Sequence, residues 1–457
     1  MLEILTLNCW GLRPISKYRI ERVNAIAIEL LASRQYDLIC LQEVWVREDF
    51  LRIYTRIKQN YPHSKFFITG ALGSGLCIFS KHPILSTKTI PYHLSGRPLG
   101  FSDFFVNKAA GSVVIEHPEL GQVEVFTTHM HAGGPEGYHI GNSYRSLQAW
   151  QLSNEIRRAS SQGRYVIACG DFNFQSNELP YAVLRDHGLV KDAWICSRAR
   201  NNRDVETADR VDRPCSSAME ALSEAGITVD SPLNSWTLTK NIPIEVQRTF
   251  GKRLDYIFFR DPSPPPRWPL TDRINPSLQC TSSEVVVTSH VPGKDYSYSD
   301  HFAVRASFSL SSSMPATSAT TTELTNNNRY NGEISSPTLS DRSTSSNTPL
   351  SMFSGEKKRQ MLNELRRVVE HHREVHVPHG RHLLIGVPVA LVLLVAFTIS
   401  TAFLPNHSYY SPIFAFFAGI AGFGGCVALV TGFVWARWED GALRRSLEEL
   451  AEETDHL

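Results

Sequence analysis

"VIACGDFNFQSNE", residues 166–178, contains the pattern that decides the fold. The apolar run 166–169 ends at Gly170, and the acid Asp171 and the amide Asn173 follow directly. A short apolar run that ends in glycine and asparagine predicts a buried strand. Such a strand is a rigid support, and its end holds two different polar groups at the edge of a sheet. Polar residues at the ends of the other predicted strands are therefore candidates for the same site.

The same pattern recurs at the ends of other predicted strands. Any one of these polar residues alone is explained by a turn or a helix cap. A turn, however, requires neither a glutamate after an apolar strand nor a histidine at two strand ends, so together they predict a site for metal and acid–base chemistry. Besides Asp171 and Asn173, the residues are Asn8, Glu43, His129, Asp255, Asp300 and His301.

The remaining pattern of residues 1–310 predicts many strands and a few helices, which favours two packed sheets with helices outside. We expect residues 197–230 to form a long surface loop, and Ser16 to cap the first helix. The predicted strands are 2–9, 37–43, 65–69, 75–80, 111–117, 122–129, 164–170, 252–260, 283–289 and 301–309. The predicted helices are 17–33, 143–160 and 178–187.

Charge and cysteine content narrow the class of protein. The 457 residues include 46 basic and 45 acidic ones, for a formal net charge of +1, which gives no general attraction to nucleic acid. The eight cysteines occur singly, without metal-binding spacing, and we expect them to be reduced. The opening "MLEILTLNCW" reads as a strand, so we expect no secretory signal.

The C-terminal third predicts a membrane anchor. Residues 311–354 are rich in Ser, Thr and Asn, and we expect a disordered linker that lets the domain reach back to a membrane. Residues 383–404 and 413–436 carry no charge, and each exceeds the ~20 residues that span a bilayer. Two buried helices of a soluble protein are the alternative, but such helices usually keep a polar face. The two segments predict a transmembrane hairpin.

Basic residues flank the hairpin on both sides, whereas its connector has none. The positive-inside rule therefore places domain 1–310 and the short tail 437–457 in the cytosol. Residues 355–382 predict a basic amphipathic helix next to the membrane, with an apolar stripe that includes Leu365 and Val369. The stripe either packs on the protein or, as the position favours, contacts anionic lipid.

Several motifs occur in an order that resembles one family. They are "LNCWGL", "SKYRIERV", "LQEVW", "GSGLCIFSKHPI", "THMHA", "QAWQL", "GDFN" and "SDH". The pattern is similar to the DNase I-like phosphoesterases, and within them to the neutral sphingomyelinases and inositol phosphosphingolipid phospholipases C. This resemblance implies an α+β fold for residues 1–310, a four-layered DNase I-like sandwich of two mixed sheets flanked by helices, followed by the two-helix hairpin.

The resemblance also implies roles for the strand-end residues around Mg²⁺. Glu43 would bind the metal, because Mg²⁺ favours one or two carboxylates, and Asn8 would assist at the metal or at a phosphate oxygen. His301, with an ordinary pKa near ~6.5, would take a proton from water while Asp255 orients it. The other roles are proton donation to the leaving oxygen by His129, water and phosphoryl contacts by Asp171 and Asn173, and support of the His301 loop or the metal by Asp300.

A loop in "DFFVNK" matches a second feature of that family. Asp103 and Lys108 stand where its members carry a switch that couples membrane lipid to activity, with the lysine reaching the substrate. Without the resemblance, the two would be an exposed pair of no consequence. His131 in "THMHA" is either structural or a phosphate contact, and the sequence leaves both open.

The expected function is Mg²⁺-dependent hydrolysis of sphingophospholipids by a membrane-anchored phospholipase C. The partners would be a sphingolipid substrate, the bilayer and an anionic phospholipid activator such as phosphatidylserine, with no nucleic acid. The sequence leaves open a phosphoinositol or phosphocholine headgroup, and an endomembrane such as the endoplasmic reticulum or the mitochondrial outer membrane. The alternatives are a nuclease or inositol polyphosphate phosphatase of the same fold, and an inactive membrane scaffold.

Overall fold

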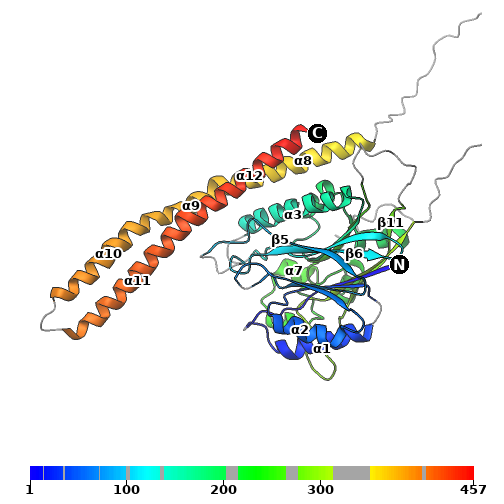
Figure 1. Cartoon of the computed structure of the whole chain (residues 1–457), viewed down its shortest axis with the longest axis horizontal. Coiled ribbons are helices and arrows are strands. Elements are labelled where there is room, and N and C mark those ends of the chain that lie inside the picture. Colours follow the sequence, from blue (N-terminus) through cyan, green and yellow to red (C-terminus); the bar gives the residue numbers. More distant parts are fainter. Residues whose placement is uncertain are drawn as a thin grey trace, which may run out of the picture.

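Two six-stranded sheets pack face to face in the computed structural model (Figure 1). The structure describes residues 1–13, 15–33, 36–71, 73–98, 103–133, 138–201, 215–263, 276–311, 350–403 and 408–457. The first sheet has the order β11-β12-β1-β2-β4-β3, and the second has the order β5-β6-β7-β8-β10-β9.

Both sheets are mixed, since β1–β2 and β7–β8 are parallel pairs among antiparallel neighbours. A parallel pair brings the carboxyl ends of both strands to the same edge. The first sheet contains β1 (Leu2–Asn8), β2 (Leu38–Gln42), β3 (His63–Phe67), β4 (Leu76–Ser80), β11 (Leu278–Val286) and β12 (Ala303–Leu310). The second contains β5 (Ile84–Pro91), β6 (Ala109–His117), β7 (Gly121–His129), β8 (Tyr165–Asp171), β9 (Lys191–Asp192) and β10 (Asp255–Arg260).

The inner faces of the two sheets share one core, in which Ile4 and Cys40 of the first sheet meet residues such as Val125 and Ile167 of the second. Helices α1 (Arg19–Ser33) and α2 (Arg47–Ile57) cover the outer face of the first sheet, and α3 (Tyr138–Ser161) covers the second (Figure 1). The expected four-layered α+β sandwich is confirmed.

The shorter helices differ most from the sequence-based expectation. Residues 197–230 are not simply a loop, because helical structure covers 197–201 and 218–225. Residues 202–214 lie outside the described residues. Ser16 does not cap α1, which begins at Arg19; its hydroxyl donates to the Leu12 carbonyl. The short helices are α4 (Leu179–Ala182), α5 (Ala193–Asn201), α6 (Ala218–Glu220) and α7 (Ile244–Arg248), with π-helical turns at Val183–His187 and Ala221–Ala225.

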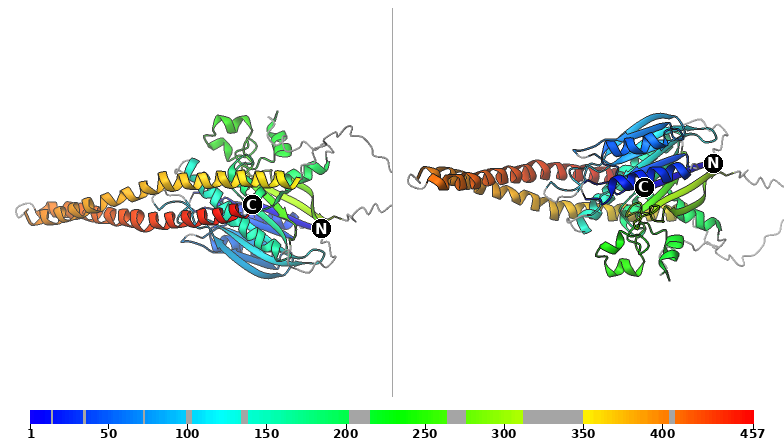
Figure 2. Two further views of the ribbon diagram at one scale, coloured as in Figure 1. Left: turned by 90° about the horizontal axis from the view of Figure 1, so that it is seen from above. Right: turned by 90° about the horizontal axis from the view of Figure 1, so that it is seen from below.

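Two long helices form the C-terminal part, and Figures 1 and 2 show them as an antiparallel hairpin that extends beyond the sandwich. The first runs through α8 (Leu350–His371), α9 (Val377–His382) and α10 (Gly386–Ser400), and the second through α11 (Ser411–Leu429) and α12 (Ala436–Asp455). Both are long and apolar enough to cross a membrane, and their most apolar windows are 0% and 11% buried. By length and composition, the α10–α11 end is suited to membrane association.

The opposite end of the hairpin packs on the sandwich, next to α3. Leu365 and Val369 of α8 are fully buried in the same cluster as Trp150 of α3 and Leu443 of α12. Of the two alternatives for this stripe, packing on the protein is therefore the one observed, and a contact of this helix with anionic lipid would have to come from its basic residues. Helix α8 already begins at Leu350, inside the predicted linker, whose residues 312–349 lie outside the described residues.

Candidate active site

The strand register brings the predicted residues together. His129 at the end of β7 pairs with Asp171 at the end of β8, and Asp171 pairs with Asp255 at the start of β10. Asn8 ends β1 in the facing sheet, opposite the residue before Glu43. The side chains of two sheets thus meet where these strands end. We call this end of the sandwich the active edge.

Two glycines permit the close approach of the backbone at this edge. A Cβ at Gly170 would lie 2.1 Å from the Thr128 carbonyl oxygen, and one at Gly11 would lie 2.2 Å from the carbonyl oxygen of Glu43. Glu43 itself has a φ of 57°, which is uncommon for a residue with a side chain. These constraints restrict the backbone at Glu43 and at Gly170, next to Asp171.

Glu43 and Asp171 are linked by Asn8. The Asn8 Nδ2 donates to Glu43 Oε1 at 3.1 Å and to Asp171 Oδ2 at 3.0 Å, while its Oδ1 accepts from the Trp10 N–H at 2.9 Å. In this arrangement Asn8 orients the two carboxylates, and direct binding of a metal through its oxygen would require the amide to turn over.

The charges around Glu43, Asp171 and Asp300 suit a divalent cation. We call this group of carboxylates the metal corner. Burial raises the pKa of Glu43, and the charge of Asp300 raises it further. Asp300 Oδ1 is buried and has no hydrogen-bond partner within the described part of the chain, while Oδ2 accepts from Lys240 at 3.1 Å. Buried carboxylates that repel one another and keep a free oxygen are what a hard cation such as Mg²⁺ stabilises. Glu43 is the residue best placed to hold it.

His301 and Asp255 form a hydrogen-bonded pair beside this corner. His301 Nδ1 lies 2.9 Å from Asp255 Oδ2, and its Nε2 lies 3.8 Å from Asp171 Oδ2. Burial lowers the pKa of His301, but the charges of Asp255 and Asp171 outweigh burial and raise it to about 10. This differs from the ordinary pKa expected from the sequence, because both carboxylates lie within a few ångströms. Burial also raises the pKa of Asp171 to about 7.

His129 faces the same carboxylates together with Lys108. The His129 Nε2 is 3.4 Å from Asp171 Oδ2 and 2.6 Å from Lys108 Nζ. Burial and the charge of Lys108 lower the pKa of His129 well below its ordinary value. As arranged, His129 accepts a hydrogen bond from Lys108, so donation of a proton by His129 would require it to receive that proton from Lys108.

Asp103 and His131 form a second layer behind Lys108. Asp103 Oδ1 lies 3.6 Å from Lys108 Nζ, and Oδ2 lies 3.0 Å from His131 Nδ1. Although burial raises it, the charge of Lys108 and the contact with His131 lower the pKa of Asp103 well below its ordinary range. His131 is fully buried here, which favours the structural interpretation of this residue.

Asn173 is anchored by its neighbours. Its φ is 53°, its N–H donates to Asp171 Oδ1 at 3.0 Å, and its Nδ2 donates to the Met130 carbonyl at 3.0 Å. The structure thus places all eleven predicted residues at one edge of the sandwich, and Asp103 and His131 contact the Lys108 side of the group.

Two residues at this edge were missed from the sequence. Trp45 Nε1 donates to Glu43 Oε2 at 3.3 Å, and its ring lies 5.9 Å from Lys108 Nζ. The motif "LQEVW" placed Trp45 next to Glu43, so it could have been found. Lys240, the partner of Asp300, carries no such signal because it lies in an irregular segment far from any strand end.

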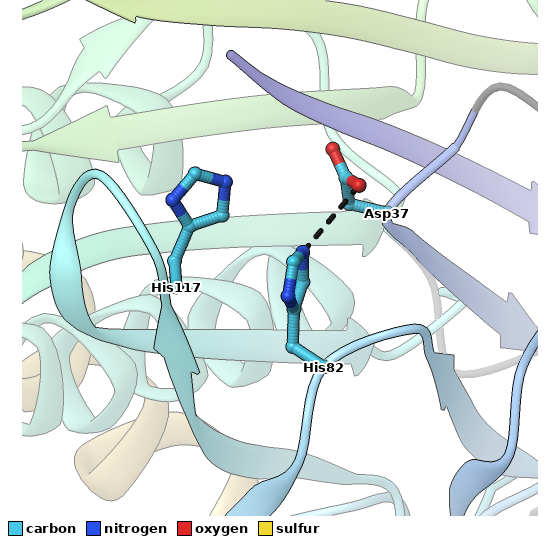
Figure 3. Close-up of side chains that lie close together, drawn as sticks. All are labelled: Asp37, His82 and His117. Atoms are coloured by element: carbon cyan, nitrogen blue, oxygen red, sulfur yellow. Dashed lines mark ion pairs between the residues drawn. The ribbon is translucent and has the colours of Figure 1, made fainter.

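A second group of histidine and aspartate lies at the opposite edge, where β2 begins (Figure 3). His82 Nε2 is 3.4 Å from Asp37 Oδ1, and the rings of His82 and His117 are 4.9 Å apart. The His117 Nδ1 accepts from the backbone N–H groups of Glu119 and Leu120 at 3.2 and 3.3 Å, so this nitrogen offers no lone pair to a metal.

Comparison with known proteins identifies the family. Residues 5–301 match the Endonuclease/Exonuclease/phosphatase family. The inositol phosphosphingolipids phospholipase C of Schizosaccharomyces pombe is 37% identical over 316 residues, 68% of each chain. The enzyme of that name from Saccharomyces cerevisiae is 26% identical over 100% of this chain and 91% of its own.

More distant relatives are also found. Human sphingomyelin phosphodiesterase 2 is 29% identical over 69% of this chain and 66% of its own. The crystal structure of beta toxin from Staphylococcus aureus with bound magnesium ions covers 67% of this chain and 98% of its own, with 17% identity and a TM-score of 0.47. The chain is therefore an enzyme of the Endonuclease/Exonuclease/phosphatase family, and it belongs to the group of phosphodiesterases that comprises the neutral sphingomyelinases and the inositol phosphosphingolipid phospholipases C.

Proposed function

We propose that the chain is a membrane-anchored, Mg²⁺-dependent phospholipase C that hydrolyses sphingophospholipids to ceramide and the phosphorylated headgroup. The observation that carries the proposal is the convergence of Glu43, Asp171 and the Asp255–His301 pair at one edge. The names of the relatives supply the substrate class, inositol phosphosphingolipids, sphingomyelin or both.

A phosphodiester is anionic and resists attack by water, so the site must supply positive charge and a proton acceptor. A divalent cation held by Glu43 would supply Lewis-acid stabilisation of the phosphoryl oxygens. His301, held through Nδ1 by Asp255, turns its Nε2 toward Asp171 and can accept the proton of an attacking water.

The remaining groups surround the phosphate and the leaving oxygen. The Lys108 ammonium is buried and adds positive charge beside His129. We assign to the Lys108–His129 pair the delivery of a proton to the departing ceramide oxygen. Asn173 would donate to a phosphoryl oxygen and Asp171 would orient the water, while Asp300 supports the loop before His301 through Lys240.

The membrane part of the proposal rests on α10 and α11 and on the charges beside them. The basic flanks favour a multi-pass protein with its catalytic domain in the cytosol, on an endomembrane such as the endoplasmic reticulum or the mitochondrial outer membrane. Since the apolar stripe of α8 is buried, an activating anionic lipid such as phosphatidylserine would instead meet exposed basic residues beside the spans, such as Arg381 and Arg437.

The test is an assay of the full-length protein in mixed micelles on four labelled substrates: inositol phosphoceramide, sphingomyelin, DNA and a soluble inositol polyphosphate. We expect release of ceramide from at least one sphingolipid, and we expect Mg²⁺ to restore this release after chelation. We expect no hydrolysis of DNA or of the inositol polyphosphate. Hydrolysis of DNA or of the inositol polyphosphate at a comparable rate would contradict the proposal. The Glu43→Gln variant serves as the control for a contaminating activity.

A further inference from the structure

Glu439, in the first turn of α12, extends from the hairpin into the catalytic domain. Its carboxylate is buried and accepts hydrogen bonds from the Tyr144 hydroxyl at 2.7 Å, from Arg97 at 3.2 Å and from His372 at 3.1 Å. Burial raises its pKa, but the bond from His372 and the charge of Arg97 outweigh burial and lower it to about 2. Glu439 is therefore a buried anion with three partners from three different segments.

Tyr144 connects Glu439 to the second layer of the active site. The Tyr144 ring packs edge-to-face on His131, with centroids 5.1 Å apart at 89°. His131 in turn holds Asp103 Oδ2 at 3.0 Å, and Asp103 faces Lys108, whose Nζ lies 2.6 Å from His129. A continuous series of contacts thus runs from the end of the apolar hairpin to the catalytic edge.

A second contact joins the same two regions. Phe104, the neighbour of Asp103, meets Trp435 with ring centroids 4.9 Å apart in an edge-to-face arrangement. Residues 103–108 are thus held on one side by the hairpin and on the other by His131 and His129. Neither contact involves the metal corner, so the hairpin acts on the Lys108 side of the site.

We infer that Glu439 is a positioning residue for the segment 103–108: it fixes Tyr144, and through His131 and Asp103 it keeps the Lys108 ammonium beside His129. The helix that leaves the membrane span would thus complete the active site and do more than anchor it. For its activity readout, this inference rests on the proposed function.

Glu453 provides a matched control on the same helix. Its carboxylate accepts from Arg157 of α3 at 2.8 Å and from Lys358 of α8 at 2.6 Å, so it also docks α12 on the domain. Its contacts lie at the far end of α3 from Tyr144, and none of them involves the segment 103–108. A purely structural role of α12 would make the two carboxylates equivalent.

The experiment uses the full chain in detergent micelles and compares Glu439→Gln, Glu453→Gln, Asp103→Asn and the double variant Glu439→Gln/Asp103→Asn. Amide hydrogen exchange of residues 103–108 is measured without substrate, and kcat and KM are measured on labelled sphingolipid. For Glu439→Gln we expect faster exchange in 103–108 and a loss in kcat of about 10- to 10²-fold, with KM changed by less than about twofold. For Glu453→Gln we expect neither change.

We expect the double variant to be no slower than Asp103→Asn alone, because both substitutions act through Lys108. Normal exchange and normal kcat in Glu439→Gln, equal effects of Glu439→Gln and Glu453→Gln, or additive losses in the double variant would each overturn the inference. If the wild-type protein hydrolyses no sphingolipid, the proposed function fails, and the exchange measurement still decides the placement of 103–108.

Discussion

Two groups of histidine and aspartate lie at opposite edges of the same sandwich, and only one has the character of an active site. Asp171, Asp255 and His301 lie at one edge, and Asp37, His82 and His117 at the other (Figure 3). By ligand type and distance alone, both could hold a metal ion. Residue type and proximity are therefore insufficient to identify a site.

The difference lies in how far the protein itself satisfies each group. Asp37 accepts from the Glu3 N–H at 2.8 Å and faces Lys81 at 3.9 Å, so its charge is compensated, although the buried His82 Nε2 makes no hydrogen bond within the described part of the chain. At the active edge, Glu43 has a raised pKa and Asp300 keeps a buried oxygen without a partner in the described part of the chain. Buried polar groups that lack a hydrogen bond or an opposite charge mark a functional site, because a bound ligand can supply the missing partner.

The largest expected effect is the loss of metal binding, which should occur at the active edge and not at the other edge. Glu43→Gln removes the charge that would hold the cation, and since Lewis-acid stabilisation is worth several kcal/mol, we expect a loss of about 10⁴-fold or more in kcat. The matched substitution Asp37→Asn at the other edge should leave kcat unchanged. Sphingolipid turnover and Mg²⁺ binding by calorimetry check both variants. Equal losses in the two would remove the distinction between the edges.

The next effect concerns the proton acceptor. His301→Ala should lower kcat by the ~10²–10⁴-fold typical of a lost general base. Asp255→Asn should give a smaller loss, because it keeps the imidazole and disturbs only its orientation. We expect the double variant to resemble His301→Ala, since the two residues act as one unit. Near-normal kcat in His301→Ala would show that another group takes the proton.

The sequence predicted the active edge well because strand ends are local features. Apolar runs located ten of the strands to within a few residues, and polar residues at the ends of several of these strands are the ones that the fold brings together. Two strands were missed: β5 is an edge strand with mostly exposed polar residues, and β9 has two residues. Helix α2 was also missed, although Phe50, Ile53 and Ile57 repeat at helical spacing.

What the sequence could not predict depends on contacts between distant residues. The stripe of α8 is equally suitable for a bilayer and for α3, and only the packing of Leu365 with α3 and α12 decides between them. The bond between Tyr144 and Glu439 joins positions 295 residues apart, so no local pattern reports it. The pKa of His301 likewise follows from carboxylates on two other strands.

A moderate effect on stability is expected at the satisfied edge. Asp37→Ala leaves the Glu3 N–H without its acceptor and removes the partner of His82, which should destabilise the fold by about 1–3 kcal/mol. Because the site lies at the far edge, kcat at a temperature well below unfolding should stay normal. Thermal unfolding with Glu116→Ala, an exposed position on β6, as the control measures the effect. An unchanged melting temperature would mean that water compensates Asp37 equally well.

The pH dependence of stability should differ in sign between the two edges. Burial and the nearby His82 lower the pKa of His117, so the folded state binds fewer protons than the unfolded state, and stability should fall as the pH drops through ~6.5. His301 has its pKa raised to about 10, so its contribution is present below pH ~6.5 and is lost as the pH rises toward 10.

His117→Asn keeps an acceptor near the Nδ1 position and should flatten the acid limb of a plot of melting temperature against pH. His301→Gln should flatten the alkaline limb, when both are measured with a chelator so that no metal binds. If both variants changed the same limb, the two histidines would share one electrostatic environment, and the contrast between a satisfied edge and an active edge would be wrong.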